Sequence, residues 1–198
     1  MYTFAHFLQN RFPFIWTLVE KINEWLFLLR YGKKLHGITP ILNKYSNPLI
    51  YRQAEEKDID SLICFFQEQP EDSYKYFTPH KFNEKTIKKL IRNKSYLFFI
   101  VLDNDHIVGY YFLRCFFVKK CYLGKLADYR FQGKGIGKTM CLSAMEIARS
   151  LGLHMYETIS KDNLPSLYST QKVLDTKIIK EMENNYIYIE DFPKGTLK

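Results

Sequence analysis

The sequence contains little cysteine, and its few cysteines follow no ligand pattern. Cys64, Cys115, Cys121 and Cys141 form no C-x-x-C pair, and no cluster of histidines accompanies them. Zinc sites and disulfide frameworks normally need closely spaced cysteines. We therefore expect neither a metal site nor a disulfide framework, and we interpret the four thiols as reduced side chains of a cytoplasmic protein.

A long apolar run is also missing. The most apolar part of the sequence, within residues 1–35, is interrupted by Glu20, Lys21, Asn23 and Glu24. No stretch reaches the roughly 18 apolar residues that indicate a membrane-spanning helix. The same segment lacks the small-residue cleavage site of a secretory signal. These absences exclude a spanning helix and a secretory signal from the expected organisation.

Low-complexity tracts are absent, and the composition is that of a folded protein. The chain has 198 residues, of which 46% are hydrophobic, 17% aromatic and 25% charged, enough for one sizeable core with an appendage. Lysine and arginine exceed acidic residues by 29 to 21. This excess favours an anionic ligand or an anionic membrane surface. Nucleic acid is a disfavoured partner, because the basic residues are scattered rather than clustered.

The N-terminal part differs in composition from the rest and predicts a separate unit. Ile22, Trp25, Leu26 and Leu29 recur at helical spacing, which predicts an amphipathic helix that begins just after Pro13 and ends near Gly32. Proline and asparagine then indicate a linker, at Pro40, Asn47 and Pro48. We expect residues 1–48 to form a helical extension with a linker, and residues 49–198 to form the main domain.

Three roles are open for this helix. It can cover an exposed face of the main domain, pair with a second chain in a homodimer, or lie on a membrane as a peripheral contact. In the membrane interpretation, aromatic side chains anchor the helix and basic side chains contact headgroups: Trp16, Trp25 and Phe27, and Arg30, Lys33 and Lys34.

The main domain alternates strands and helices. Apolar periodicity and turn residues predict, in chain order, a strand at 50–54, helices at 58–66 and 84–92, strands at 96–102, 107–118 and 121–127, a helix at 137–151, a strand at 154–160, a helix at 164–173, and a C-terminal hairpin of strands near 178–179 and 186–189. Asp58 is the expected N-cap of the first of these helices. This order predicts an α+β (mixed α/β) fold.

A glycine-rich segment, Arg130–Met140, suggests a phosphate-binding loop. A P-loop needs four residues between its first glycine and Gly-Lys-[Ser/Thr], but Gly133 and Gly137 are separated by only three. The dinucleotide fingerprint also fails, because its third glycine would fall at Lys138 and an antiparallel meander precedes the loop. What remains is a loop that leads into a helix, whose free amides and dipole favour an anion.

This segment resembles motif A of the GCN5-related N-acetyltransferases (GNAT), whose pattern is [Gln/Arg]-x-x-Gly-x-[Gly/Ala]. Gln132-Gly133-Lys134-Gly135-Ile136-Gly137 matches it in full. The opening Arg52–Ile59 stretch, the hairpin around Asp103–Asp105, and Asp162-Asn163-Leu164-Pro165-Ser166 resemble further family elements in the same order. The resemblance covers about residues 50–190 and leaves out the N-terminal 48.

The resemblance implies a fold and a donor substrate. The fold is a twisted, mostly antiparallel mixed sheet flanked by helices, which splays between strands 121–127 and 154–160. Acetyl-CoA, or another acyl-CoA, binds at that splay, and no metal is implied. The implied cofactor-binding residues are Leu126 and Ala127 along the pantetheine arm, Gln132, Gly133, Lys134, Gly135, Ile136, Gly137 and Lys138 around the pyrophosphate, and Asn163.

The residues that carry the chemistry are less well marked. The family attacks directly, so Cys121 and Cys141 are not expected to act as nucleophiles. A glutamate base on the strand before motif A is absent here. His80 is the candidate base, because a histidine titrates near neutral pH, and Asp72 and Glu71 are the other candidates. A structural histidine beside a proline turn is the alternative.

The general acid is equally open. Many family members place a tyrosine seven residues after the motif asparagine, where this sequence has Thr170. Tyr168, five residues after Asn163, or Tyr156 on the neighbouring strand could protonate the leaving thiolate instead, as could solvent. Asn163 is expected to contact the cofactor or an ordered water. The candidate catalytic residues are thus His80, Asn163 and Tyr168.

The function expected from the sequence is acyl-CoA-dependent N-acyl transfer, with acetyl as the acyl group and a primary amine as the acceptor. The aromatic segment Tyr74–His80 could stack on a sugar, which favours an amino-sugar or a nucleotide-linked amino-sugar. A protein or peptide amine is the second candidate acceptor. A non-catalytic CoA-binding or membrane-docked module is the alternative from another class.

Overall fold

The computed structural model describes residues 13–197, without the side chains of Pro13, Phe14 and Trp16. The helices are α2 (Pro13–Tyr31), α3 (Ile38–Tyr45), α4 (Ile59–Glu68), α5 (Glu84–Arg92), α6 (Ile136–Leu151) and α7 (Leu164–Val173). Short 3₁₀ turns are η1 (Gly32–Gly37), η2 (Glu56–Asp58), η3 (Glu71–Tyr74), η4 (Tyr129–Phe131) and η5 (Glu183–Asn185).

The strands form one twisted sheet. They are β1 (Ile50–Gln53), β2 (Tyr96–Asp103), β3 (His106–Phe116), β4 (Lys120–Ala127), β5 (His154–Ser160), β6 (Leu174–Glu181) and β7 (Tyr186–Pro193), in the spatial order β1-β2-β3-β4-β5-β7-β6. All neighbours are antiparallel except β4 and β5, which are parallel. The predicted mixed α/β class and the order of the elements in the main domain are confirmed.

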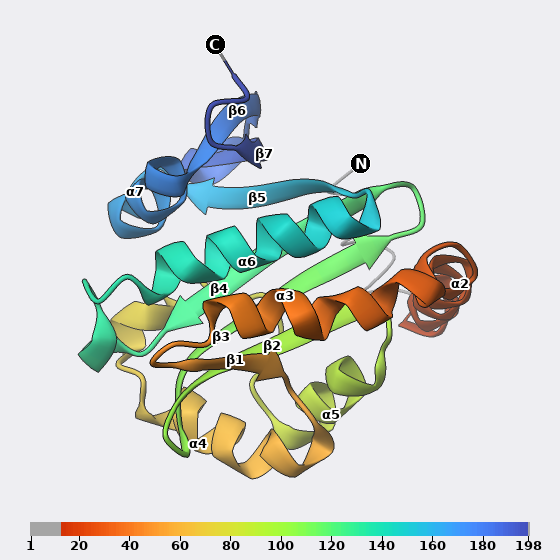
Figure 1. Ribbon diagram of the computed structural model, residues 1–198, viewed down its shortest axis with the longest axis horizontal. Coiled ribbons are helices and arrows are strands. Elements are labelled where there is room, and N and C mark those ends of the chain that lie inside the picture. Colours follow the sequence, from red (N-terminus) through yellow and green to blue (C-terminus); the bar gives the residue numbers. More distant parts are fainter. Residues whose placement is uncertain (1–12, 198) are drawn as a thin grey trace.

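Helices cover both faces of the sheet and bury a separate core on each. In Figure 1, α3 and α6 cross one face, while α4 and α5 lie on the other side. The first core joins α3 and α6 to strand residues such as Phe99 and Tyr111, and the second joins α4 and α5 to Phe98 and Tyr110. Successive strand residues point to opposite faces, so β2 and β3 are apolar throughout rather than alternating.

The parallel strands β4 and β5 stay together for only a short distance. Their register consists of Lys120↔His154, Cys121↔Met155 and Tyr122↔Tyr156. Beyond Tyr122 and Tyr156 the strands separate, although β4 continues to Ala127 and β5 to Ser160. We call this separation the β4–β5 splay. It is where the family resemblance implies a gap in the sheet.

The predicted linker is partly helical. Residues 38–45 form α3, and Ile38, Ile41 and Leu42 are buried in the core shared with α6. Pro40 does not prevent this helix, because a proline in the first turn removes an amide that has no helical partner there. Asp58 also differs from the prediction, because its side chain accepts from the Glu55 amide (2.8 Å) and pairs with Arg52 instead of capping α4.

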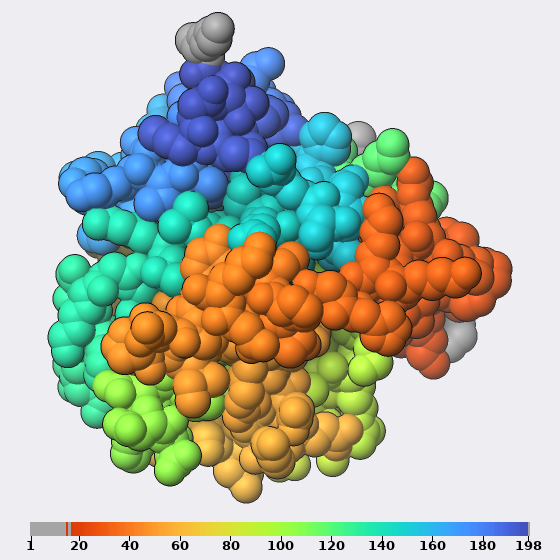
Figure 2. All heavy atoms as spheres, viewed as in Figure 1, coloured from red at the N-terminus to blue at the C-terminus, as the bar shows by residue number. Residues whose placement is uncertain are grey.

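The predicted N-terminal helix is confirmed, with α2 ending one residue before Gly32. Figure 2 shows the red-orange residues of α2 projecting at the right-hand margin of the molecule, beyond the packed layers. Within residues 13–197, none of the helices has the length and apolar character needed to cross a bilayer.

Candidate active site

The β4–β5 splay leaves one edge of β4 without a strand partner. Gly124 to Ala127 still pair with β3 on their other edge, from Phe112 to Gly109. On the side of β5 the pairing has ended at Tyr122. Main-chain donors and acceptors along this edge can therefore bind an extended ligand as an added strand would be bound.

A loop and the N-terminus of α6 follow directly after β4. Gly133 and Gly135 have φ of 80° and 88°, a left-handed conformation that glycine adopts without strain. Lys138 and Thr139 donate their amides to Gly135 O (3.0 and 3.1 Å). The preceding helical amides, those of Ile136 and Gly137, are the terminal donors that a helix cannot pair internally. Together with the helix dipole they favour an anion at this point.

A buried carboxylate holds the start of this loop in place. Asp128 has no exposed surface, and it accepts three hydrogen bonds from Arg130, from the main-chain N (2.8 Å), Nε (2.9 Å) and Nη2 (2.7 Å). Gln69 adds a longer bond from Nε2 (3.4 Å) and accepts from the Tyr129 amide (3.1 Å). Burial alone would raise the pKa of Asp128, but these hydrogen bonds outweigh it and lower the pKa.

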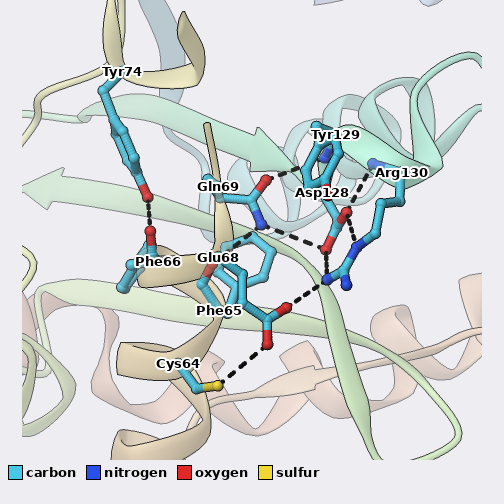
Figure 3. A network of polar contacts seen from close by, with 9 residues as sticks. All are labelled: Cys64, Phe65, Phe66, Glu68, Gln69, Tyr74, Asp128, Tyr129 and Arg130. Carbon is cyan, nitrogen blue, oxygen red and sulfur yellow. Dashed lines mark hydrogen bonds and ion pairs between the residues drawn. The ribbon is translucent and has the colours of Figure 1, made fainter. Parts of the chain in front are cut away.

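Figure 3 shows that this network connects the end of α4 to the loop. The Arg130 guanidinium reaches Glu68 Oε2 (2.6 Å) as well as Asp128, and Gln69 Nε2 also donates to Phe65 O (3.1 Å). The loop after β4 is thus fixed from the α4 side before the chain enters α6.

A buried ion pair lies just beyond the last β4–β5 pair. Lys125 Nζ is 2.8 Å from Glu157 Oε2, and their side chains are 8% and 4% exposed. Lys125 also donates to Thr170 Oγ1 (2.9 Å), and Thr170 donates to Glu157 Oε1 (3.1 Å). We call Lys125, Glu157 and Thr170 the buried triad. An ammonium can donate three hydrogen bonds. Among the described residues, Lys125 donates two, to Glu157 and to Thr170.

The surroundings of the buried triad keep Lys125 charged. Burial would lower the pKa of Lys125, but Cys141 once ionised, the Glu157 carboxylate, and Asp191 once ionised raise it above the ordinary value. Asp191 is buried beside Glu157, and a proton on one of the two carboxyl groups allows a hydrogen bond between them. Burial and repulsion from Glu157 raise the pKa of Asp191 to about 9, so it is protonated at neutral pH. Burial likewise raises the pKa of Cys141 to about 11, which makes this thiol a poor nucleophile.

His80 lies in an aromatic cluster on the face of α4 and α5. Its Nε2 is 2.6 Å from the Tyr110 hydroxyl, and its Nδ1 is 3.1 Å from Lys81 O. Phe66, Phe82 and Phe98 surround the ring. Burial lowers the pKa of His80 to about 4, against the raising effect of the Lys81 carbonyl. The imidazole is therefore neutral at physiological pH, with Nδ1–H donating to Lys81 O and Nε2 accepting from Tyr110.

The candidates on β5 and α7 are spread around the splay. Asn163 caps α7 by accepting from the Ser166 amide (3.3 Å). Tyr168 is 62% exposed, and Lys138 of α6 and Lys172 lie over its ring. Tyr156 is buried and stacks on Tyr188. Thr170, at the position of the family's tyrosine, is fully buried within the triad.

The segment before α5 contains a lysine that senses charge from the turn after β5. Lys75 has a raised pKa, because of a hydrogen bond and attraction to Tyr76 and then the charges of Asp72 and Asp162. Asp162 follows β5 directly, so Lys75 lies within electrostatic range of the β5–α7 turn. Glu71 and Asp72 are exposed there.

The sequence interpretation missed the buried triad. Lys125 shares the face of the apolar Cys121 and Leu123, and Glu157 shares the face of Met155 and Ile159, because alternate strand residues point the same way. A charge on the apolar face of each of two neighbouring strands is a signal of a buried pair. It could have been found once the two strands were paired.

Comparisons with known proteins agree with this geometry. Residues 59–172 match the model of the acetyltransferase (GNAT) family. No curated protein matches the chain. Among solved structures, the paia N-acetyltransferase from Thermoplasma acidophilum in complex with coenzyme A is similar, with a TM-score of 0.60 and 16% identity over 72% of this chain and 97% of that one.

Two further solved structures have the same fold. The spermidine N-acetyltransferase chimera from Vibrio cholerae and hSSAT is 18% identical, with a TM-score of 0.57 over 73% of this chain and 95% of that one. The acetyltransferase from Salmonella typhimurium that modifies the N-terminal serine of ribosomal protein L7/L12 is 16% identical, with a TM-score of 0.57 over 75% and 95%. At these identities the likeness concerns the fold.

Proposed function

This chain belongs to the acetyltransferase (GNAT) family, and on that premise we propose that it transfers the acetyl group of acetyl-CoA to a primary amine by direct attack. The observation that carries the proposal is the β4–β5 splay, which opens beside the N-terminus of α6. An extended thioester with an anionic pyrophosphate matches both parts, a free strand edge and a helix N-terminus.

The residues present fit this donor. The edge of β4 at Leu126 and Ala127 would bind the amides of the pantetheine arm. The amides of the 132–138 loop would bind the pyrophosphate (Gln132, Gly133, Lys134, Gly135, Ile136, Gly137 and Lys138), with Lys134 and Lys138 adding positive charge. The Oδ1 of Asn163 would go on accepting from the α7 N-terminus, while its amide NH₂ would donate to acetyl-CoA or to a water.

In place of the family's tyrosine, which Thr170 replaces, the buried triad would supply a positive charge rather than a proton. During the proposed reaction the acceptor nitrogen bonds to the acetyl carbon, the carbon–sulfur bond breaks, and negative charge passes to the sulfur. Lys125 is a fixed cation just beyond the last β4–β5 pair, held by Glu157 and Thr170. Its role would be electrostatic, because its raised pKa makes it a weak proton donor. The thiolate would then take its proton from solvent or from Tyr168.

The acceptor is proposed from the aromatic segment that precedes α5. Lys75, in the segment from Tyr74 to His80, is within range of the charge of Asp162 in the turn after β5, and the aromatic side chains of this segment can stack on a sugar. An amino-sugar, free or linked to a nucleotide, is our first choice. A protein or peptide amine is the second, and it corresponds to what one similar structure is described as modifying.

Release of the CoA thiol tests the function. With acetyl-CoA and a panel of amino-sugars, nucleotide-linked amino-sugars, polyamines and peptides, we expect thiol release that depends on one amine class, with the acetylated amine identified by mass. Binding of acetyl-CoA without turnover on any amine would instead support a non-catalytic CoA-binding module. Failure to bind acetyl-CoA at all would contradict the proposal.

A second experiment tests His80 as the base. His80→Gln should lower kcat by about 100-fold or more if the imidazole accepts the amine proton. For that role, His80 Nε2 must give up its hydrogen bond with Tyr110 and bind the amine or a water instead. Since the folded pKa is about 4, the wild-type rate should show no ionisation of His80 between pH 5 and about 8. An unchanged kcat in His80→Gln would rule the base role out.

The same variant has a pH signature in stability. The folded chain binds a proton at His80 only near pH 4, whereas the ordinary pKa of histidine is 6.5. The wild type should therefore lose stability as the pH falls from about 6.5 toward about 4, and His80→Gln should lose less over that window. Urea unfolding at several pH values measures the difference.

A further inference from the structure

Helix α2 has its polar side toward the protein and its apolar side toward solvent, the reverse of an ordinary surface helix. The side chains of Glu20, Asn23 and Glu24 point inward and form hydrogen bonds. Ile22, Trp25 and Leu29 on the opposite side are 48%, 61% and 67% exposed. We call the exposed set the α2 apolar face: Ile15, Leu18, Val19, Ile22, Trp25 and Leu29.

Specific polar contacts fix this orientation. Asn23 Nδ2 donates to Ser95 Oγ (3.2 Å) and Cys115 O (3.0 Å), and its Oδ1 accepts from the Phe117 amide (3.2 Å). The Lys94 amide donates to Glu24 (2.6 Å), and Glu20 pairs with Lys89 (2.7 Å). Rotating α2 to bury its apolar side would break all of these bonds, so the outward face is built into the docking of the helix.

Apolar packing on the inner side of the C-terminal half of α2 also holds the helix against the domain. Phe27 is fully buried and packs against Tyr31. Phe27 is therefore a core residue, not the membrane anchor expected from the sequence, while the side chain of Trp16 lies outside the described residues. Of the three expected anchors, Trp25 alone has a described, exposed side chain on the outer face.

The charged residues around the α2 apolar face indicate what kind of surface can bind it. At 100° per residue, Lys21 and Arg30 lie at the two margins of the apolar sector, and Lys33 follows in η1; all three are exposed. Both acids of α2, Glu20 and Glu24, are engaged on the inner side. A second copy docked on this face about a two-fold axis would bring the same set of cations close to this one, whereas an anionic lipid surface attracts them.

We propose that the α2 apolar face lies in the headgroup region of an anionic membrane, with Trp25 and the aliphatic residues in the acyl boundary and Lys21, Arg30 and Lys33 at the phosphates. An exposed apolar sector flanked by cations is the arrangement of an interfacial helix. Lys34 bonds Leu151 O at the C-terminal end of α6, so α2 lies far from the α6 N-terminus (Figure 1). The proposed CoA loop would stay open to solution.

Vesicle flotation of the full chain tests this proposal. We expect the wild type to float with vesicles of phosphatidylcholine and phosphatidylserine, less with phosphatidylcholine alone, and less again at high salt. The double variant Ile22→Glu/Leu29→Glu should bind at least about tenfold more weakly, because two apolar side chains leave the interface. Both positions are exposed, so thermal unfolding should be little changed.

Ile178→Glu is the matched control, because Ile178 on β6 is 56% exposed and lies outside α2. It should float like the wild type. A wild type that fails to float with anionic vesicles, or a control that loses binding as much as the double variant, would overturn the proposal. So would a dimer on gel filtration that the double variant dissociates while vesicle binding is absent, since a second copy would then be the occupant.

Discussion

Lys125→Met should abolish most of the acetyl transfer and destabilise the fold more than any other single substitution considered for this protein. The change leaves Glu157, which is 4% exposed, without its cation. Removing one partner of a buried ion pair costs about 3–5 kcal/mol, against a total stability of about 5–15 kcal/mol for a domain. Urea unfolding measures this loss.

The catalytic part of the effect needs a variant that folds. Replacing both members of a buried pair by apolar residues is often neutral for stability, so Lys125→Met/Glu157→Met should recover most of the free energy of unfolding. Its kcat should still be about 10²–10³-fold below the wild type, as when a donor to developing negative charge is removed. Its affinity for acetyl-CoA should change much less.

The comparison separates two roles for the triad. If the double variant is stable and keeps the wild-type kcat, Lys125 is a structural cation and its proposed electrostatic role is wrong. If it is stable, binds acetyl-CoA and turns over slowly, the charge acts in the reaction. Thr170→Val is a milder companion, because it removes the hydroxyl that accepts from Lys125 and keeps the ion pair.

Asp128→Ala should weaken acetyl-CoA binding by more than about tenfold, although Asp128 would not touch the ligand. The substitution deletes four hydrogen bonds, three from Arg130 and one from Gln69. Bonds to a charged group contribute about 1.5–3 kcal/mol each at most, and one of these is the cap of η4. The loop that leads to Gly133 and Gly135 should then lose its fixed geometry.

A matched variant at Glu68 separates the effect of the buried Asp128 carboxylate from that of the exposed carboxylate nearby. Glu68→Gln removes the partly exposed ion pair with Arg130 and keeps a side-chain oxygen that can accept from Cys64 Sγ, so it should change stability much less than Asp128→Ala. Calorimetric titration with CoA, and unfolding of each variant, give the two readouts. Equal effects of Asp128→Ala and Glu68→Gln on CoA affinity would contradict the positioning role of Asp128.

The sequence alone determined most of the elements and the glycine conformations of the loop before α6. Apolar periodicity of 3.6 residues in helices and two in strands is a local property, so helix 137–151 and strand 154–160 agree with α6 and β5 within one residue. The positive φ of Gly133 and Gly135 has the same origin, because glycine is the residue that tolerates it. The predicted binding and catalytic roles of individual residues stay predictions.

Tertiary structure decided the features that depend on pairing and burial. His80 looked like a neutral-pH base in sequence, but an aromatic surround lowers its pKa to about 4. Lys125, Glu157 and Asp191 lie on strands distant in sequence, so only the sheet register brings them together. Periodicity indicated an amphipathic α2, but the direction of its apolar face depends on what Asn23 and Glu24 can bond to on β3 and before β2. A local pattern fixes which residues share a face; the neighbours of that face, and hence its charge and exposure, come from the rest of the chain.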